Sequence, residues 1–520
     1  MAKKFNITGL CVPEEHYMAD VSKKLEQTRV MVEAGEYFII NRPRQYGKTT
    51  TLYSLADVLI QSGDYIVFNT SFEGIGDAIF NDEKTFSHGF IKILARHAQV
   101  SAPFLVDWLR ESVSKIDNLD AVSDIITDLV SKTDKRVVLM IDEVDKSSNN
   151  QLFISFLAML RNKYLQRRSF KTFHAIVLAG VHDVKSLKQK MRPESEQKYN
   201  SPWNIAAEFT VDMNLYPSEI KPMLADYVAE TGVKMDTQSI ANHLFYYTSG
   251  YPFLVSKLCK MVDEQFMPQK GVKEWTNEDI DDAVQKLLFE NNTNFDTLAK
   301  YLENDPDLYR LVYRVAIDGE QVGFNSFDPI TNLAVLYGIL VNKNNFFAIH
   351  NRIYQEVIVD YMVSRISHNE WTNKFEAGIS YKNLDKSLNM EAVLERFQAF
   401  MREQYSKKDR DFLERNSRLV FLAFLKPIIN GSGYDFKEAQ ISEERRLDVV
   451  VTYLQFRYII ELKIWRGAVA HEEGLLQLTN YLDRLALTEG YLIIFDHAKR
   501  KSWKKGWTEA HGKKVFTVWV

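Results

Sequence analysis

The sequence predicts a multidomain α/β protein. In the N-terminal part of the chain, short and almost fully apolar strands are followed by helical runs, which is the pattern of a parallel sheet buried on both faces. In about the last quarter, a helix, three strands, a further helix and a strand follow one another in that order. The chain has 520 residues, of which 46% are hydrophobic, and this is enough for roughly three or four domains with sizeable cores.

A phosphate-binding loop is predicted after the first apolar strand, residues 37–40. The strand leads into Asn-Arg-Pro-Arg-Gln-Tyr-Gly-Lys-Thr-Thr, residues 41–50, and then into a helical run. A strand that enters a helix through a tight turn presents backbone N–H groups to phosphate, while Lys48 adds a positive charge and Thr49 can hold Mg²⁺. Arg42 stands where the usual G-x-x-x-x-G-K-[ST] motif has its first glycine. An ordinary basic turn is therefore the alternative.

A pair of acidic residues supports a nucleotide site. Residues 136–141 form an apolar strand that ends in Asp142 and Glu143, and a buried parallel strand ends at the edge of the sheet where ligands bind. Asp142 would bind Mg²⁺ through water, and Glu143 would activate the water that attacks the γ-phosphate. A third strand, residues 173–178, leads to His182, which is either a γ-phosphate sensor or a surface loop residue.

These residues resemble the AAA-like ATPases of the STAND and archaeal-ATPase type. In that family the arginine-rich loop R-P-R-x-[FY]-G-K-[ST] commonly replaces the glycine-led one, so Arg42 is compatible with ATP binding. The resemblance also implies that residues 9–17 lie near the nucleotide base and that residues 249–254 are a lid motif in which Pro252 begins a helix; simple helix punctuation is the alternative. The residues that the resemblance assigns to ATP are Arg44, Gln45, Tyr46, Gly47, Lys48, Thr49, Thr50 and Pro252, and those assigned to Mg²⁺ are Thr49 and Asp142.

The middle of the chain predicts two small domains. Residues 217–265 hold three helical segments separated by Gly232 and Gly250, which would form a helical lid that closes on ATP. Residues 295–362 hold helices, two short strands around a Lys-Asn-Asn turn and a closing helix, as in a winged helix that packs on the nucleotide core or binds DNA. The expected boundaries are 1–215 for an AAA-like P-loop ATPase core, 216–292 for the lid, 293–368 for the winged-helix-like domain, 369–389 for a connecting segment and 390–520 for the C-terminal domain.

A second group of chemically active residues lies in the C-terminal domain. Asp448 is at the start of an apolar run, and a second run carries Glu461 and Lys463, so that the two runs spell Asp-(x)12-Glu-x-Lys across a hairpin. Strand side chains alternate between faces, so Glu461 and Lys463 point the same way and Asp448 can approach them from the neighbouring strand. Two carboxylates and an ammonium suit Mg²⁺ or Mn²⁺ and phosphodiester cleavage. Solvated charges at a sheet edge are the alternative.

Elements on both sides of this hairpin fit a nuclease fold. Residues 411–429 predict an amphipathic helix, and Glu438 lies at the head of the strand before Asp448. Gln477 and Tyr481 are four residues apart on the next helix and therefore share one face. The order resembles the PD-(D/E)xK nuclease superfamily, and Gln-xxx-Tyr resembles an element of its RecB-like branch. The whole chain thus resembles bacterial AAA-ATPase-like proteins that carry a C-terminal domain of this superfamily.

The resemblance implies a role for each residue of this group. The implied catalytic residues are Asp448, Glu461 and Lys463, the implied metal ligands are Glu438, Asp448 and Glu461, and the residues that help to position nucleic acid are Gln477 and Tyr481. Glu414 is a weaker candidate for the acid on the first helix.

Composition and charge exclude several classes of protein. Two cysteines, Cys11 and Cys259, rule out a disulfide framework and suggest a reducing compartment. The N-terminus lacks an apolar signal core and no apolar stretch is long enough to span a bilayer, so we expect a cytoplasmic protein without a membrane partner. Because the formal net charge is −4, nucleic-acid contacts must come from local patches such as residues 499–507, where cations alternate with tryptophans. Solvated surface is the alternative for that stretch.

Functional hypotheses of different classes stay open. In the first, ATP binding and hydrolysis control a nuclease that uses Mg²⁺ or Mn²⁺ to cleave nucleic acid. DNA is expected as the substrate before RNA, although no residue distinguishes the two. A homo-oligomer would let Arg161, Arg167 or Arg168 reach a neighbour's γ-phosphate, unless they form a solvated helix face. The alternatives are a STAND-type signalling switch whose nuclease-like domain only binds nucleic acid or protein, and a DNA-remodelling or mobile-element helper. Defence against invading DNA is the extrapolated biological role.

Overall fold

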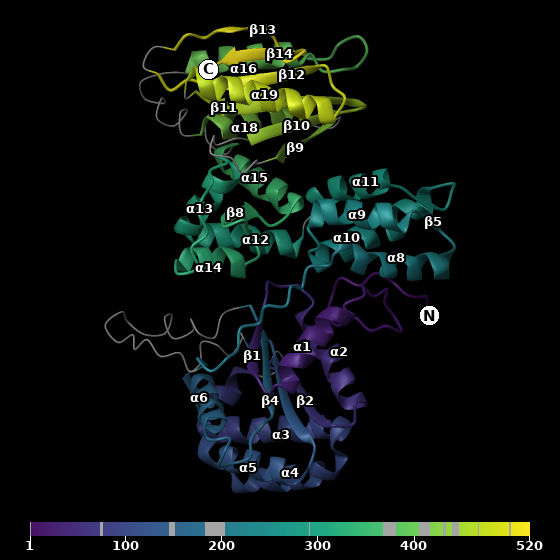
Figure 1. Cartoon of the computed structure of the whole chain (residues 1–520), viewed down its shortest axis with the longest axis vertical. Helices are drawn as coiled ribbons and strands as arrows, with labels where there is room; N and C mark the ends of the chain where they lie inside the picture. Colours follow the sequence, from purple (N-terminus) through teal and green to yellow (C-terminus); the bar gives the residue numbers. More distant parts are fainter. Residues whose placement is uncertain are drawn as a thin grey trace. The chain divides into compact units, whose positions relative to one another are not determined.

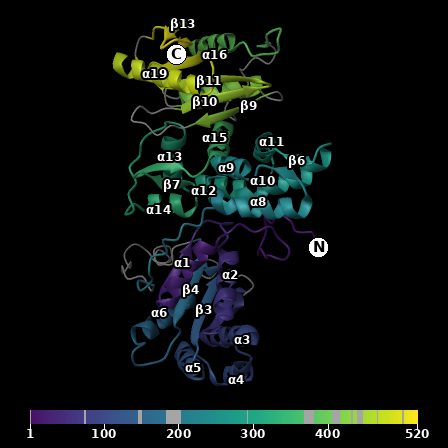
Figure 2. The ribbon, with the colours of Figure 1, turned by 45° about the vertical axis from the view of Figure 1, so that its right-hand side comes forward.

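The computed structural model describes the chain in segments that form two compact units. The described residues are 2–72, 76–144, 151–181, 203–290, 292–367, 381–404, 416–429, 433–438, 447–465, 467–498 and 501–520. The first unit is Met1–Ala283 and the second is Val284–Val520. Figure 1 and Figure 2 show the elements of each unit from two directions. None of the described helices is both long enough and apolar enough to cross a membrane.

A parallel sheet forms the centre of the first unit. Its four strands are β1 (Tyr37–Asn41), β2 (Tyr65–Ser71), β3 (Arg136–Asp142) and β4 (Ala175–Gly180), and their order in the sheet is β1-β4-β3-β2. All three strand pairs are parallel, so the carboxyl ends of the strands meet at one edge. This confirms the α/β class predicted from the apolar strands. It also brings the residues after β1 and β3 to the same edge.

Helices cover both faces of this sheet (Figure 1). α1 (Ser22–Glu33) and α2 (Lys48–Gln61) pack on one face. The other face carries α3 (Glu83–Ser101), α5 (Leu119–Ser131) and α6 (Gln151–Leu165), with α4 (Val106–Ser112) packed on α3. The core on that face takes alternate strand residues such as Phe68, Leu139 and Leu178, as the two-residue period of a strand requires. Side-chain caps start two of the helices, because Asp82 accepts a hydrogen bond from Thr85 N and Asn118 accepts one from Ala121 N.

The helices expected for a lid are present in the first unit. They are α8 (Pro217–Thr231), α9 (Thr237–Thr248), α10 (Pro252–Met261) and the first half of α11 (Asn277–Leu288), which continues past the boundary at Ala283; the short strands β5 (Lys234–Met235) and β6 (Glu274–Trp275) pair with each other. Gly232 and Gly250 follow α8 and α9 with φ values of 69° and 78°, a left-handed conformation in which glycine avoids a steric cost. The prediction that Gly232 and Gly250 separate the helices is therefore confirmed.

We expect Gly250→Ala to destabilise the first unit strongly. A Cβ atom at Gly250 would lie 2.4 Å from the backbone oxygen of Leu215, and Leu215 N donates a 2.7 Å hydrogen bond to Gly250 O that holds the two backbones together. The clash adds to the cost of the left-handed conformation, so the expected loss is about 3 kcal/mol or more. The measurement is the midpoint of chemical denaturation followed by circular dichroism.

Gly232→Ala is the matched control for this substitution. Gly232 has a similar φ of 69°, but its added Cβ would meet nothing within 4 Å, so only the conformational cost of about 1–2 kcal/mol remains. Equal shifts of the denaturation midpoint in the two variants would contradict the close backbone approach at Gly250.

The second unit begins with helices and a small hairpin. The helices are α12 (Thr293–Asn304), α13 (Pro306–Ala316), α14 (Pro329–Leu336) and α15 (Arg352–Ser367), and the antiparallel hairpin consists of β7 (Leu340–Lys343) and β8 (Phe346–Ile349). Asn344 and Asn345 have φ values of 54° and 66°, as a two-residue hairpin turn requires. The expected Lys-Asn-Asn turn is thus present, and the winged-helix classification stays a prediction.

A mixed six-stranded sheet forms the rest of the second unit. Its strands are β9 (Gly433–Glu438), β10 (Leu447–Tyr453), β11 (Phe456–Ile464), β12 (Glu489–Phe495), β13 (Lys505–Ala510) and β14 (Lys513–Trp519), in the order β13-β14-β12-β11-β10-β9. β9, β10 and β11 are antiparallel neighbours, whereas β12 lies parallel to β11. The parallel connection passes through α19 (Ala468–Arg484), which packs on one face; α16 (Met390–Gln404) and α18 (Ser417–Ile429) are the other helices of this part (Figure 1). The predicted order of helix, three strands, helix and strand is confirmed.

Candidate functional site

The loop between β1 and α2 is wound around the side chain of Lys48. Lys48 is the first residue of α2 and is only 7% exposed. Its Nζ donates hydrogen bonds to the backbone oxygens of Arg42 and Pro43, at 2.9 and 2.7 Å. Gln45 and Gly47 have φ values of 57° and 76°, which turn the chain tightly into the helix. The N-terminus of α2 and the Lys48 ammonium are therefore presented together, as phosphate binding requires.

Arg42 serves a structural purpose beside this loop. Its guanidinium donates hydrogen bonds to the oxygens of Asn41 and Val211, both at 2.8 Å, and lies 5.2 Å from the ring centroid of Phe209. Burial lowers the pKa of the Arg42 guanidinium below its usual value. The side chain is committed to the segment 209–211, next to β1. Arg42, which stands at the first glycine position of the motif, thus stabilises the loop by contacting the segment 209–211.

Thr49 and Asp142 meet at the carboxyl edge of the sheet. Thr49 Oγ1 donates a 2.5 Å hydrogen bond to Asp142 Oδ2, and Asp142 is only 5% exposed. The other oxygen, Oδ1, accepts a 2.9 Å hydrogen bond from the backbone N–H of Glu143. Glu143 has a φ of 55° and is partly exposed. A hydroxyl and a carboxylate oxygen are the hard ligands that Mg²⁺ prefers, so the residues present fit this ion.

A pair of tyrosines joins the loop to the lid helices. The rings of Tyr46 and Tyr251 pack edge to face with centroids 4.7 Å apart. Tyr251 Oη donates a 2.6 Å hydrogen bond to the backbone oxygen of Arg44, and Tyr46 Oη is hydrogen-bonded to Asn214. Burial raises the pKa of Tyr46. Since Pro252 begins α10 directly after Tyr251, the conformation of the loop and the start of the lid helix are coupled.

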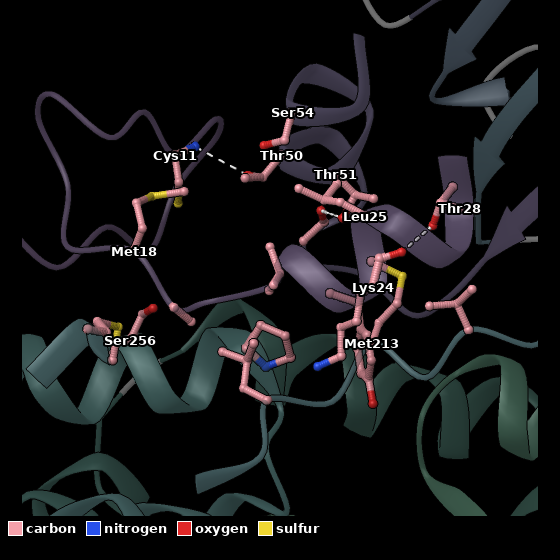
Figure 3. Close-up of a pocket in the computed structure, with 18 of the residues that line it drawn as sticks. Cys11, Met18, Lys24, Leu25, Thr28, Thr50, Thr51, Ser54, Met213 and Ser256 are labelled. Atoms are coloured by element: carbon pink, nitrogen blue, oxygen red, sulfur yellow. Dashed lines mark hydrogen bonds between the residues drawn. The ribbon is translucent and has the colours of Figure 1, made fainter. Parts of the chain in front are cut away.

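A cavity lies next to the loop. It is mostly apolar and is lined by the N-terminal segment, α1, α2, the segment 209–215 and the lid helices. Figure 3 shows around it Cys11, Met18, Lys24, Leu25, Thr28, Thr50, Thr51, Ser54, Met213 and Ser256. Gly47 and Pro252 also line it, and Cys11 N donates a 3.2 Å hydrogen bond to Thr50 Oγ1. Because this cavity adjoins the phosphate loop, a ligand whose phosphates bind at the loop would have the mostly apolar walls of the cavity beside it.

Sequence reasoning missed the α1 and 209–215 residues of the cavity. Lys24, for example, lines the cavity and forms a 2.5 Å ion pair with Glu219 of α8. α1 carries no motif, and its apolar and polar residues alternate without a clear helical stripe. No signal in the sequence could therefore have placed these residues at the cavity.

Three acidic positions of the second unit lie side by side in the mixed sheet. In the backbone register, Asp448 of β10 is directly opposite Glu438 of β9 and Glu461 of β11. Directly opposite positions of antiparallel strands share one face of a sheet. The side chains of Glu438 and Asp448 lie outside the described part of the structure. The hairpin predicted from the sequence is confirmed, and the register brings position 438, already expected to supply a metal ligand, next to position 448.

Lys463 lies close to the backbone of α19. Glu461 and Lys463 are only 2% and 3% exposed, and a Cβ atom at Gly474 would lie 2.3 Å from Lys463 Nζ. A side chain at this point of the helix would force the ammonium to move from its position. Burial and, next, the positive charge of Lys463 lower the pKa of His471, one turn before Gly474. The lysine therefore sits in a narrow space between β11 and α19.

A family model decides which family the chain belongs to. Residues 12–358 match the model of the AAA-like domain, and the match covers well over half of the chain. The chain belongs to the AAA-like family. The matched region includes the phosphate loop, the acidic strand end, the helices α8 to α11 and the residues that line the cavity, except Cys11. The candidate nucleotide site thus lies inside the AAA-like part, whereas β9 to β14 follow the end of the match.

The AAA-like protein also has distant relatives and structural neighbours. An uncharacterized WD repeat-containing protein of Synechocystis sp. is 22% identical over 265 residues, which are 50% of this chain and 21% of that protein. The chain therefore spans about a fifth of the length of that relative. The Walker-type ATPase of Pyrococcus abyssi is 13% identical with a TM-score of 0.46, over 68% of this chain and 99% of that one. The ORC2 protein of Aeropyrum pernix is 12% identical with a TM-score of 0.37, over 66% and 93%.

Several other predicted residues of the AAA-like protein have structural partners or cannot be placed. Arg161 donates to Asn204, and Arg167 lies over the ring of Tyr164. In the stretch 499–507, Lys505 pairs with Glu395 at 2.7 Å and Trp507 donates to Glu391. These contacts favour the solvated and structural interpretations of both clusters. His182, Glu414, Lys499 and Arg500 lie outside the described residues.

The two helix residues expected to position nucleic acid differ in exposure. Both lie on α19, as predicted, but Gln477 is exposed whereas Tyr481 is half-buried and packs against the core between α19 and the sheet. Although Gln477 and Tyr481 are about one helical turn apart, the side chain of Gln477 faces solvent and that of Tyr481 packs against the core.

Proposed function

We propose that this AAA-like protein binds and hydrolyses ATP, and that its C-terminal domain, residues 390–520, is a PD-(D/E)xK-type nuclease under the control of the nucleotide. The observation that carries the nuclease part is the register of Glu438, Asp448 and Glu461 on neighbouring strands, with the buried Lys463 two positions further along. The domain boundaries 1–215, 216–292, 293–368, 369–389 and 390–520 belong to the same proposal, and so does the winged helix.

In the proposed ATPase site, each residue has one task. The N-terminus of α2 and Lys48 bind the phosphates, with the loop residues 44–47 and Thr50 around them. Thr49 and Asp142 hold Mg²⁺, which neutralises charge on the phosphate oxygens when it is bound. Glu143 accepts a proton from the attacking water, and its position directly after Asp142 supports this role. The adjoining cavity receives the base and sugar, and Pro252 closes it from the lid.

In the proposed nuclease site, the acidic residues and Lys463 have different roles. Glu438, Asp448 and Glu461 would hold Mg²⁺ or Mn²⁺, which polarises the phosphodiester and lowers the pKa of a bound water. Lys463 orients that water or balances the developing charge. Gln477 is exposed on α19 and can contact the nucleic acid together with Tyr481. The proposed substrate is nucleic acid, and DNA is preferred over RNA as the first candidate. The proposed biological role is in defence or mobile-element biology.

One observation favours a second function. Glu461 and Lys463 are both almost fully buried, and a substrate must reach catalytic groups. A STAND-type signalling ATPase, in which the nuclease-like domain only binds nucleic acid or protein, needs no such access. The register of the three carboxylate positions favours the nuclease function, and the burial of Glu461 and Lys463 favours the signalling switch.

A substrate panel distinguishes the two functions. Purified protein is incubated with single- and double-stranded DNA and RNA, with Mg²⁺ or Mn²⁺, and with or without ATP. The nuclease proposal expects metal-dependent cleavage of at least one substrate that EDTA abolishes. Binding without cleavage under every condition would support the signalling switch instead.

Gly474→Ala tests the place of Lys463 in the proposed reaction. The new methyl group must displace Lys463 Nζ, which is 2.3 Å from its position, while alanine is the better helix former by about 1 kcal/mol. We therefore expect cleavage to fall at least about tenfold, because misplacing a catalytic group is costly, with little change in the melting temperature. Initial cleavage rates and thermal melts measure the two effects.

Leu476→Ala is the control on the same helix, since Leu476 is 44% exposed. It should cleave at the wild-type rate. Wild-type cleavage by Gly474→Ala would mean that the position of the Lys463 ammonium has no part in the reaction.

A further inference from the structure

A buried arginine connects the AAA-like part of the second unit to the strand of the proposed nuclease site. Arg418, on α18, is only 2% exposed. Its Nη1 donates a 3.0 Å hydrogen bond to the backbone oxygen of Ile317 and lies 3.7 Å from Asp318 Oδ1. Its Nη2 donates to the backbone oxygen of Leu462 at 3.5 Å, the long end of the hydrogen-bond range. One guanidinium thus contacts two separate elements.

The two contacted elements have distinct origins. Ile317 is the C-terminal cap of α13, inside the region that matches the AAA-like family. Leu462 lies on β11 between Glu461 and Lys463, beyond the end of that match. A cation at the C-terminus of a helix is favoured by the helix dipole and by the free carbonyls there. The planar fork of an arginine can serve both backbone oxygens at once, which a lysine ammonium on a flexible stem does less well.

Other contacts also join the same parts, such as the 3.4 Å hydrogen bond that Tyr313 Oη of α13 donates to Asn416 Oδ1, directly before α18. α15 packs against α18 and β9, and Lys426 of α18 pairs with Asp360 of α15 at 3.4 Å, with both side chains more than a third exposed. Such exposed pairs contribute little. Removing one member of a buried charged contact is far more disruptive, because the remaining polar groups stay desolvated. Arg418 is therefore a buried contact that can carry a shift of α13 to β11.

We propose that Arg418 is a positioning residue that couples the end of α13 to β11, and so sets the position of Glu461 and Lys463. A movement of α13 would pull on the Leu462 carbonyl and change the separation of the two flanking side chains from the neighbouring strands. The consequence for cleavage rests on the proposed nuclease function. The mechanical coupling itself does not depend on it.

The coupling is tested by hydrogen–deuterium exchange of the full-length protein. In Arg418→Met, amide exchange in peptides covering both 313–318 and 458–464 should rise at least about fivefold relative to wild type. Lys426→Met, at the exposed pair of the same interface, should leave both peptides unchanged. If Arg418→Met fails to fold, Asp318→Asn removes the 3.7 Å ion pair at a partly exposed site, and should raise exchange in the same two peptides to a smaller extent. Unchanged exchange at 458–464 in a folded variant overturns the inference.

Kinetics then separate this inference from the proposed function. Arg418→Met should lower kcat for nucleic-acid cleavage about tenfold or more with KM within about twofold, and Arg418→Lys should restore part of the rate. ATP turnover, which belongs to the first unit, should not change. Raised exchange at 458–464 in a protein whose wild type cuts no substrate would leave the coupling in place and reject the nuclease function. Normal kcat in Arg418→Met, with the wild type active, would reject the positioning role.

Discussion

Lys48→Ala is expected to abolish ATP turnover, with a loss of at least about a hundredfold. The Lys48 ammonium is the buried positive charge at the N-terminus of α2, held by the oxygens of Arg42 and Pro43. A triphosphate would exchange these two neutral acceptors for a charged one, and removing one preorganised charge from such a site typically costs about 10²–10³ in rate. The measurements are phosphate release at saturating ATP and binding of a fluorescent ATP analogue.

Lys92→Ala provides the control for that prediction. Lys92 is an exposed residue of α3, so its loss changes the net charge equally but leaves the loop intact. Thr49→Ala is expected to show the same loss as Lys48→Ala at low Mg²⁺, because Thr49 meets Asp142 at the proposed ion site. Wild-type nucleotide affinity and turnover in Lys48→Ala would remove the phosphate-loop assignment.

Glu461→Gln and Lys463→Met are expected to eliminate metal-dependent cleavage, by about a thousandfold each. Glutamine keeps the shape of Glu461 but removes the charge that a divalent cation needs, and methionine keeps the length of Lys463 without its ammonium. Asp448→Asn should give the same loss, because its backbone is directly opposite Glu461. The readouts are cleavage rates with Mg²⁺ and Mn²⁺, and Mn²⁺ binding followed by electron paramagnetic resonance.

An exposed ion pair on the same sheet supplies matched controls. Glu489 of β12 and Lys514 of β14 are 3.9 Å apart and largely solvated, so Glu489→Gln and Lys514→Met make identical chemical changes away from the proposed site. Both should cleave at the wild-type rate. Because Glu461 and Lys463 are buried, circular dichroism must first establish that their variants fold. Folded Glu461→Gln that cleaves and binds Mn²⁺ normally would exclude a metal centre at this position.

Much of the local structure could be predicted from sequence patterns. The apolar strand 136–141 is almost fully buried in a parallel sheet, and the Asp-Glu pair at its end lies where ligand sites form. Gly232 and Gly250 end helices in the left-handed conformation. Asn344 and Asn345 form the hairpin turn. In each case a short-range property, such as hydrophobic period or tolerance of positive φ, is sufficient.

Contacts between distant residues could not be predicted in this way. The side chain of Arg42 reaches the segment 209–211, more than a hundred and sixty positions away in the chain. The motif suggested an arginine in the place of a glycine, but only the fold shows which carbonyls it satisfies. The surroundings of Gly474 could not be predicted either, because the atom that an added Cβ would displace belongs to Lys463 on a different element.

Sequence patterns alone predicted the α/β class, the phosphate loop with Lys48 and Thr49, the acidic strand end, and the Asp448, Glu461 and Lys463 pattern. These follow from residue chemistry at short spacing. The three-dimensional fold was needed to show that Thr49 touches Asp142, that positions 438, 448 and 461 lie directly opposite one another on neighbouring strands, and that Arg418 contacts both α13 and β11. Strand order and side-chain contact depend on the packing of the whole chain, and one sequence without its fold does not carry that information locally.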